Sequence, residues 1–65
     1  MTITCATLPA AAQVLDALIR ANLRLGRDFH IAPLNGGAPI RITVLVALPA
    51  DVLRQLRAIT DTTMA

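Results

Sequence analysis

Twice along this chain a strand-like run leads through Leu-Pro-Ala into a helix-like run, and this repeat constrains the fold more than any other feature. The first copy spans residues 3–10 and the second spans residues 42–50. Proline is favoured in the first turn of a helix, where its missing N–H needs no partner. Pro9 and Pro49 therefore each mark the point at which a strand gives way to a helix, and we expect strands and helices to alternate.

The hydrophobic pattern predicts the elements around these two prolines. Residues 2–7 are β-branched at four of six positions and predict the first strand. Apolar side chains then recur at intervals of three and four, which predicts an amphipathic helix of about 16 residues that stops at Gly26. Residues 28–34 and 40–48 predict the second and third strands, and the residues after the second proline predict a second helix.

The order of these elements indicates one α+β domain, residues 1–65, with a ferredoxin-like plan. The plan is βαββα, followed by a truncated last strand in residues 62–65. Asn35-Gly36-Gly37 permits positive φ and predicts a hairpin turn between the second and third strands. Right-handed crossovers place both helices on one face of an antiparallel or mixed sheet, and we expect the first and third strands to be adjacent and parallel.

The third predicted strand has one fully apolar face and one half-apolar face. Its apolar face consists of Ile40, Ile42, Val44, Val46 and Leu48, and its other face consists of Arg41, Thr43, Leu45 and Ala47. A half-apolar second face is typical of a central strand that is covered on both sides. We therefore expect the sheet to be covered on its second face within an assembly.

A chain of 65 residues gains little stability from one core, on the order of 3–5 kcal/mol, so small domains usually add a disulfide, a metal or a partner. The single cysteine, Cys5, excludes an internal disulfide, and no cluster of His, Cys, Asp and Glu predicts a metal site. Self-association or a partner protein remains as the means of stabilisation, and we predict a homodimer.

The charged residues are few, with six arginines, four aspartates and a formal net charge of +2. Arg20, Arg24 and Arg27 are spaced to share one stripe of the first helix, which is the best candidate for phosphate binding. We favour a solvated helix face on which Asp16 pairs with Arg20, and we predict no nucleic-acid binding, because a single aromatic residue excludes base stacking. The apolar run at residues 42–50 is far shorter than the roughly 20 residues that span a bilayer, and no basic leader is present, so we predict a cytoplasmic protein without membrane association.

Candidates for catalysis are limited to Cys5 and His30. Nucleophilic catalysis needs an activated nucleophile beside an oriented base. We expect Cys5 to lie in the core with Ile3, and His30 to lie on the strand face opposite Phe29 and Ile31, at a subunit contact. The four carboxylates fall at helix surfaces and ends, at Asp16, Asp28, Asp51 and Asp61. The sequence therefore predicts no catalytic residue, no metal, no cofactor and no enzyme activity.

The start of the first helix, at Leu8-Pro9-Ala10-Ala11, offers small side chains directly after a strand. Backbone N–H groups at a helix N-terminus can hold the carboxylate of a small ligand. The alternative is that these alanines only continue the helix, and the spacing alone favours that alternative.

These segments together resemble a known family. The strand that runs into Leu8-Pro9-Ala10, the sequence Phe29-His30-Ile31 in the second strand, and the helix ending at residues 56–61 resemble the ACT domain. Within that family the chain is most similar to the short small subunits of acetolactate synthase, and the resemblance covers nearly the whole chain. It implies an ACT-like fold and a regulatory subunit that binds and activates a thiamine-diphosphate-dependent large subunit in branched-chain amino acid biosynthesis.

The same resemblance implies a place for an amino-acid effector, valine or leucine. The residues that match this place are Leu8, Pro9, Ala10, Ala11, His30 and Ile31. The chain departs from the family at Ala10, where a glycine is usual, and at Leu8, where a polar residue is usual. These departures favour an activating subunit that does not respond to an effector. Two other readings stay open: a stand-alone small-ligand sensor, and a small interaction or inhibitor module of the kind that phages encode.

Overall fold

The computed structural model describes residues 1–33, 37 and 39–65. The elements are β1 (Thr2–Cys5), α1 (Leu8–Arg20), β2 (Phe29–Ala32), β3 (Ile40–Val44), α2 (Ala50–Arg57) and β4 (Thr62–Met64). This order confirms the predicted βαββα arrangement, and the truncated last strand is a real strand of three residues. The central residues of the predicted hairpin turn, Asn35 and Gly36, lie outside the described residues.

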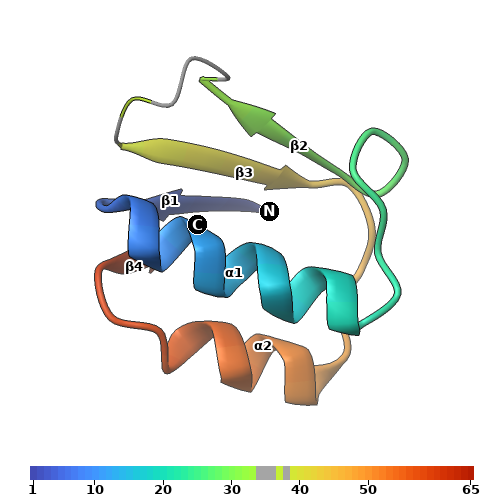
Figure 1. Ribbon diagram of the computed structural model, residues 1–65. Coiled ribbons are helices and arrows are strands. Elements are labelled where there is room, and N and C mark those ends of the chain that lie inside the picture. Colours follow the sequence, from blue (N-terminus) through green and yellow to red (C-terminus); the bar gives the residue numbers. More distant parts are fainter. Residues whose placement is uncertain (34–36, 38) are drawn as a thin grey trace.

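The four strands form one sheet in the order β2-β3-β1-β4, and every neighbouring pair is antiparallel. Both helices cover the same face of this sheet (Figure 1). The chain is therefore an α+β protein with a ferredoxin-like arrangement. The prediction that the first and third strands are parallel was wrong, because the right-handed crossover through α1 makes β1 parallel to β2, and β3 inserts between them in the reverse direction.

Alternation along the strands determines which side chains enter the core between sheet and helices. On β3, Ile40, Ile42 and Val44 are buried, whereas Arg41 and Thr43 are exposed. Ile3 and Cys5 of β1 are completely buried, as predicted. The other buried apolar residues are Ala10, Ala11, Val14, Ala17 and Leu18 of α1, Phe29 of β2, and Val52 and Leu56 of α2.

The first helix is shorter than predicted. The side chain of Thr7 caps its start, with the Ala10 N–H donating to Thr7 Oγ1 at 3.2 Å. Asn22 then adopts a left-handed conformation, with φ 72°, directly after the cap residue Ala21, and the helix ends at Arg20, well before Gly26. Gly26, with φ 89°, instead turns the loop that leads into β2.

The face of the sheet that the helices leave open is polar. It consists of Thr2 and Thr4 of β1, His30 and Ala32 of β2, Arg41 and Thr43 of β3, and Thr63 of β4. The half-apolar face expected for the third strand is absent because β3 ends at Val44, so Leu45 and Ala47 fall beyond the sheet. The open face therefore gives no reason to expect that another layer covers it.

Candidate functional site

The start of α1 has already used most of its backbone donors. Ala10 N–H donates to the Thr7 hydroxyl, and Ala11 N–H donates to Thr7 O at 3.1 Å. Pro9 has no N–H, so Leu8 carries the one donor of this turn for which the described residues show no acceptor. Ala10 and Ala11 are also buried in the core. An anion would thus meet a single backbone donor at this helix start.

The structure does not bring the six predicted effector residues onto one surface. His30 is exposed and pairs with Thr43 on the open face of the sheet, whereas Leu8 begins the helix on the covered face. Ile31, the neighbour of His30, turns to the helix side and packs against the core. A ligand on the helix side of one chain could therefore not also reach His30.

Cys5 is enclosed, and its environment lowers its reactivity. Its exposed fraction is zero, and burial raises the pKa of the thiol, with a smaller opposing effect from a hydrogen bond to the Thr62 side chain. The thiolate is the reactive form of cysteine. His30 lies on the opposite face of the sheet, so these two candidates for catalysis are not neighbours.

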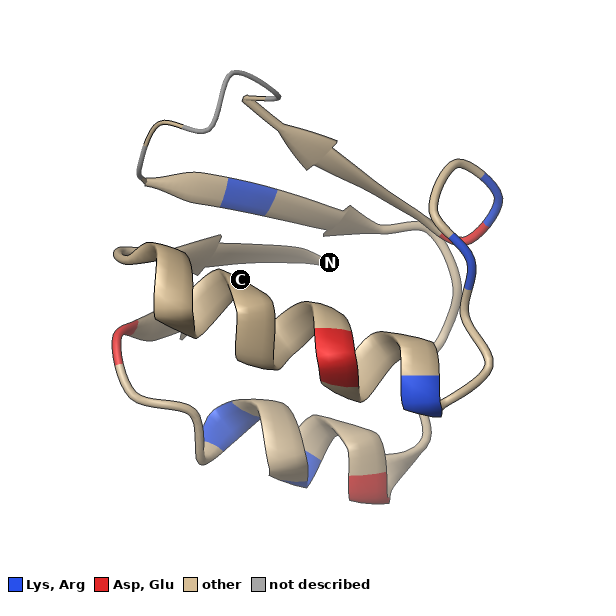
Figure 2. Cartoon of the chain, viewed as in Figure 1, with Lys and Arg blue, Asp and Glu red and all other residues tan. Residues whose placement is uncertain are grey.

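The predicted stripe of three arginines does not exist, because α1 ends at Arg20. Arg20 Nε lies 3.0 Å from Asp16 Oδ2 in the exposed ion pair that the sequence predicts. Arg24 and Arg27 belong to the loop after the helix. Figure 2 shows the arginines spread over both helices, β3 and this loop, so the basic charge is not concentrated on one face.

The loop between α1 and β2 is closed by Asp28, a role that the sequence analysis missed. Asp28 Oδ2 accepts hydrogen bonds from Arg24 N at 2.9 Å and from Arg27 Nε at 3.0 Å and Nη2 at 2.7 Å. The guanidinium of Arg27, together with the Arg24 N–H, holds the pKa of this carboxylate below its usual value. The adjacent Arg27 and Asp28, directly after Gly26, were the sequence feature from which this loop closure could have been predicted. Asp28 is a structural carboxylate, so it is not available for acid–base chemistry.

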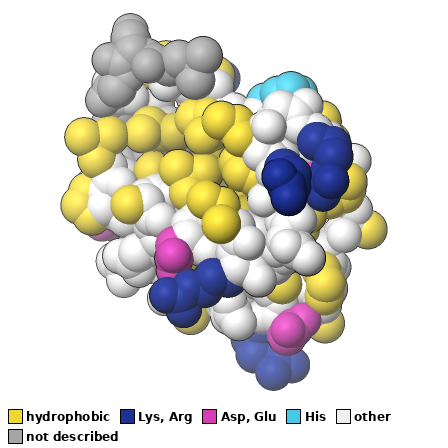
Figure 3. Space-filling model, turned by 45° about the vertical axis from the view of Figure 1, so that its right-hand side comes forward, with side chains coloured by type: hydrophobic (Ala, Val, Ile, Leu, Met, Phe, Trp, Pro, Cys, Tyr) yellow, Lys and Arg dark blue, Asp and Glu magenta, His cyan; other side chains and the backbone are white. Residues whose placement is uncertain are grey.

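An apolar surface runs along the side of α1 that faces away from α2. We call the residues Leu8, Ala12, Leu15 and Ile19 the outer face of α1; their spacing of four, three and four places them on one stripe, of which Leu15 is partly buried and packs against the core. Leu8 is 52% exposed and Ile19 is 63% exposed. Figure 3 shows hydrophobic side chains gathered on the upper left of the visible face, with charged side chains to their right and below them.

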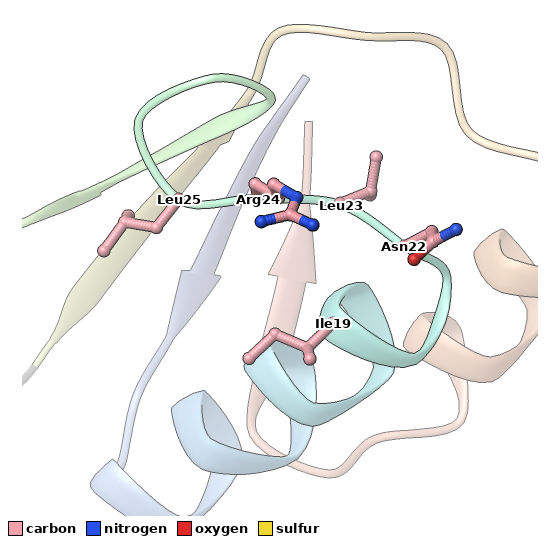
Figure 4. A pocket seen from close by; sticks show the side chains of 5 residues that line it. All are labelled: Ile19, Asn22, Leu23, Arg24 and Leu25. Carbon is pink, nitrogen blue, oxygen red and sulfur yellow. The ribbon is translucent and has the colours of Figure 1, made fainter.

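A hollow of about 410 Å³ lies at the C-terminal end of this outer face. Its lining consists of Ile19, Asn22, Leu23, Arg24 and Leu25. In Figure 4 the side chains of Ile19 and Leu25 extend to the same side, whereas the side chain of Leu23 points away from them. The hollow is open to solvent, and its lining combines three aliphatic side chains with the polar side chains of Asn22 and Arg24.

The described residues contain no group of three His, Cys, Asp or Glu side chains that could hold a metal ion. Within the same part of the chain, no helix combines the length and hydropathy needed to cross a bilayer. No protein-family model, no curated protein and no solved structure matches this chain.

Proposed function

We propose that this chain is a non-catalytic, homodimeric regulatory subunit that binds and activates a thiamine-diphosphate-dependent synthase subunit, in the manner of the acetolactate synthase small subunit. The observation that carries the proposal is the outer face of α1, which leaves Leu8 and Ile19 more than half exposed. Contiguous exposed apolar side chains mark protein contact surfaces. The separation of Cys5 from His30 supports the same reading, since neither residue has a catalytic partner among the described residues.

We propose further that activation does not depend on valine or leucine. A backbone site for an amino-acid carboxylate needs several convergent N–H donors. The capping hydroxyl of Thr7 occupies the donor of Ala10, and Pro9 supplies none, so the helix start is poorly suited to hold such a carboxylate. The side chain of Ala10 is buried as well, and this leaves little backbone open to a ligand.

Such a subunit acts through differential binding. It can favour the active form of the synthase only by as much as its affinity for that form exceeds its affinity for the inactive form. The assignment places the chain in the cytoplasm with its catalytic partner, and it needs neither a metal nor a cofactor on the chain itself.

Affinity purification of the tagged chain from its own host, followed by mass spectrometry, tests this function. Both ends of the chain need a flexible linker, because the Met1 amine donates to Val44 O and Ala65 N donates to Thr2 O within the sheet. We expect a thiamine-diphosphate-dependent synthase in near-stoichiometric amount, and a higher specific activity of that enzyme when the chain is added, with or without valine. Recovery of an unrelated protein would contradict the proposal and favour an inhibitor module, and a preparation without any partner would favour a stand-alone ligand sensor.

A further inference from the structure

We infer that the hollow at the C-terminal end of α1 binds a short aliphatic monocarboxylate. The Arg24 guanidinium holds the carboxylate, and the side chains of Ile19 and Leu25 contact the hydrocarbon chain. This inference concerns a small ligand and does not depend on the regulatory function proposed above. It also places the ligand at the opposite end of α1 from the helix start that the sequence analysis considered.

The first support is a positive charge that the protein itself does not pair. The two neighbouring arginines are paired, Arg20 with Asp16 and Arg27 with Asp28. The side chain of Arg24 makes neither a hydrogen bond nor an ion pair with any residue that the structure describes, although its backbone N–H donates to Asp28. A free guanidinium presents a planar set of N–H donors that matches the two oxygen atoms of a carboxylate.

The second support is the apolar surface beside this charge. Ile19 is 63% exposed and Leu25 is 60% exposed, more than any other large apolar side chain among the described residues. Both line the hollow, and their side chains extend to the same side (Figure 4). A hydrocarbon chain that lies against them removes apolar surface from water. The lining therefore offers a contact to each half of an amphiphilic ligand, a charge for its head and apolar surface for its tail.

The third support is that the backbone of the two polar lining residues is held in place by the protein. Asp28 Oδ2 accepts from the Arg24 N–H at 2.9 Å, and Arg27 Nη2 donates to the Asn22 carbonyl oxygen at 3.4 Å. These bonds use backbone atoms only of Asn22 and Arg24, so both side chains stay available to a ligand. A site whose backbone is already ordered loses less conformational entropy on binding.

The composition of the lining favours a monocarboxylate over an amino acid. The hollow is lined by one cation, one amide and three aliphatic side chains, and no acidic side chain is among its lining residues. The ammonium group of an amino acid would find no ion-pair partner there and would lie near the positive charge of Arg24. The Asn22 amide can donate a second hydrogen bond to the carboxylate. The volume of about 410 Å³ lies within the range of small-molecule pockets, about 300–1,000 Å³.

The end of a helix carries partial negative charge, which acts against an anion. In this chain the carbonyl oxygens of the last turn are already bonded. Leu18 O accepts from Leu23 N–H at 3.1 Å, and Ile19 O accepts from Asn22 N–H at 3.0 Å. The full charge of Arg24 therefore dominates at the hollow. Because the hollow is open to water, we expect weak binding, with a dissociation constant on the order of millimolar.

A titration of the labelled full chain, followed by backbone amide chemical shifts at neutral pH, tests the site. The probe is 4-methylpentanoate, which joins a branched aliphatic chain to one carboxylate. We expect a saturable shift at residues 19 and 22–25, at a chain concentration of a few tens of micromolar. The alcohol 4-methylpentan-1-ol keeps the hydrocarbon and lacks the charge, so it should bind at least about tenfold more weakly. Leucine has the same carbon skeleton with an added ammonium group and should also bind more weakly.

Two arginine variants form the matched pair for this titration. Arg24→Gln removes the charge of the hollow and should raise the dissociation constant of 4-methylpentanoate at least about tenfold. Arg54→Gln removes an exposed charge from α2, which does not line the hollow, and should change that constant less than about twofold. Circular dichroism of both variants checks that the fold is kept.

An unchanged dissociation constant in Arg24→Gln would overturn the site, and so would equal binding of the alcohol or of leucine. Shifts concentrated outside residues 19 and 22–25, or no saturable shift up to several tens of millimolar 4-methylpentanoate, would overturn it as well. None of these results bears on the synthase partner, because the purification experiment above tests that separately.

Discussion

Two neighbouring residues of α1 should respond in opposite ways to the same truncation. Leu18 is completely buried, whereas Ile19 is 63% exposed on the outer face. Leu18→Ala removes buried carbon atoms and leaves a cavity, which costs about 3 kcal/mol or more. A domain of 65 residues has a total stability of about 3–10 kcal/mol, so this variant should be marginally folded. Ile19→Ala should cost the monomer less than about 0.5 kcal/mol.

Urea unfolding followed by circular dichroism at two protein concentrations separates these effects. At protein concentrations below the dimer dissociation constant, only Leu18→Ala should lower the urea midpoint. At concentrations above that constant, Ile19→Ala should lower the urea midpoint as well, because it removes stabilisation that depends on association. Ile42→Val, which should cost about 1 kcal/mol, serves if Leu18→Ala does not fold. A loss of more than about 1.5 kcal/mol by Ile19→Ala in the dilute chain would refute the placement of the two residues.

Three further measurements test individual contacts. The Asp28 carboxylate has a lowered pKa in the folded chain, so its contribution to stability is full above its unfolded pKa and is lost as pH falls through the folded pKa. The difference in unfolding free energy between wild type and Asp28→Asn should therefore shrink below about pH 4. A difference that stays constant during acid titration would contradict this. At Asn22, with φ 72°, Asn22→Ala should cost about 1 kcal/mol and Asn22→Gly much less; equal thermal midpoints for the two variants would argue against a left-handed residue there. The Cys5 thiol is buried with a raised pKa, so a maleimide should modify it only at the rate of unfolding, and fast labelling of the native chain would place Cys5 elsewhere.

The fold could be predicted because the local signals agreed with one another. Pro9 and Pro49 located both helix starts to within a residue, and alternation identified the buried side of β3. The first and third strands are adjacent, as predicted, and their relative direction was the error. The crossover through α1 makes β1 parallel to β2, and the connection from β2 to β3 then reverses β3. The early end of α1 was missed because Asn22 tolerates a left-handed conformation almost as glycine does, while Gly26 was the more conspicuous signal.

The site was harder to predict because its residues depend on tertiary placement. The separation of His30 from Leu8 follows from the sheet lying between them, which periodicity within one strand does not reveal. The Ala10 N–H donates to the Thr7 hydroxyl, so this backbone donor is not free for the ligand carboxylate that the sequence analysis considered. The outer face of α1 was not identified from the sequence, which assigned Leu8 to the effector site and gave Ile19 no role; the structure shows that the buried stripe of the helix is the one with Val14 and Leu18.

Backbone amide chemical shifts recorded over a dilution series test the role of α1 most directly. The uniformly labelled wild-type chain, at concentrations from a few micromolar to several hundred micromolar, should show shifts concentrated at the outer face of α1 and at Leu25 beside the hollow. The Thr-rich open face of the sheet and the β4 edge should stay unchanged. Shifts concentrated at residues 62–64 or on the open face, or none over the whole series, would contradict the conclusion that α1 is the surface through which this protein meets another chain.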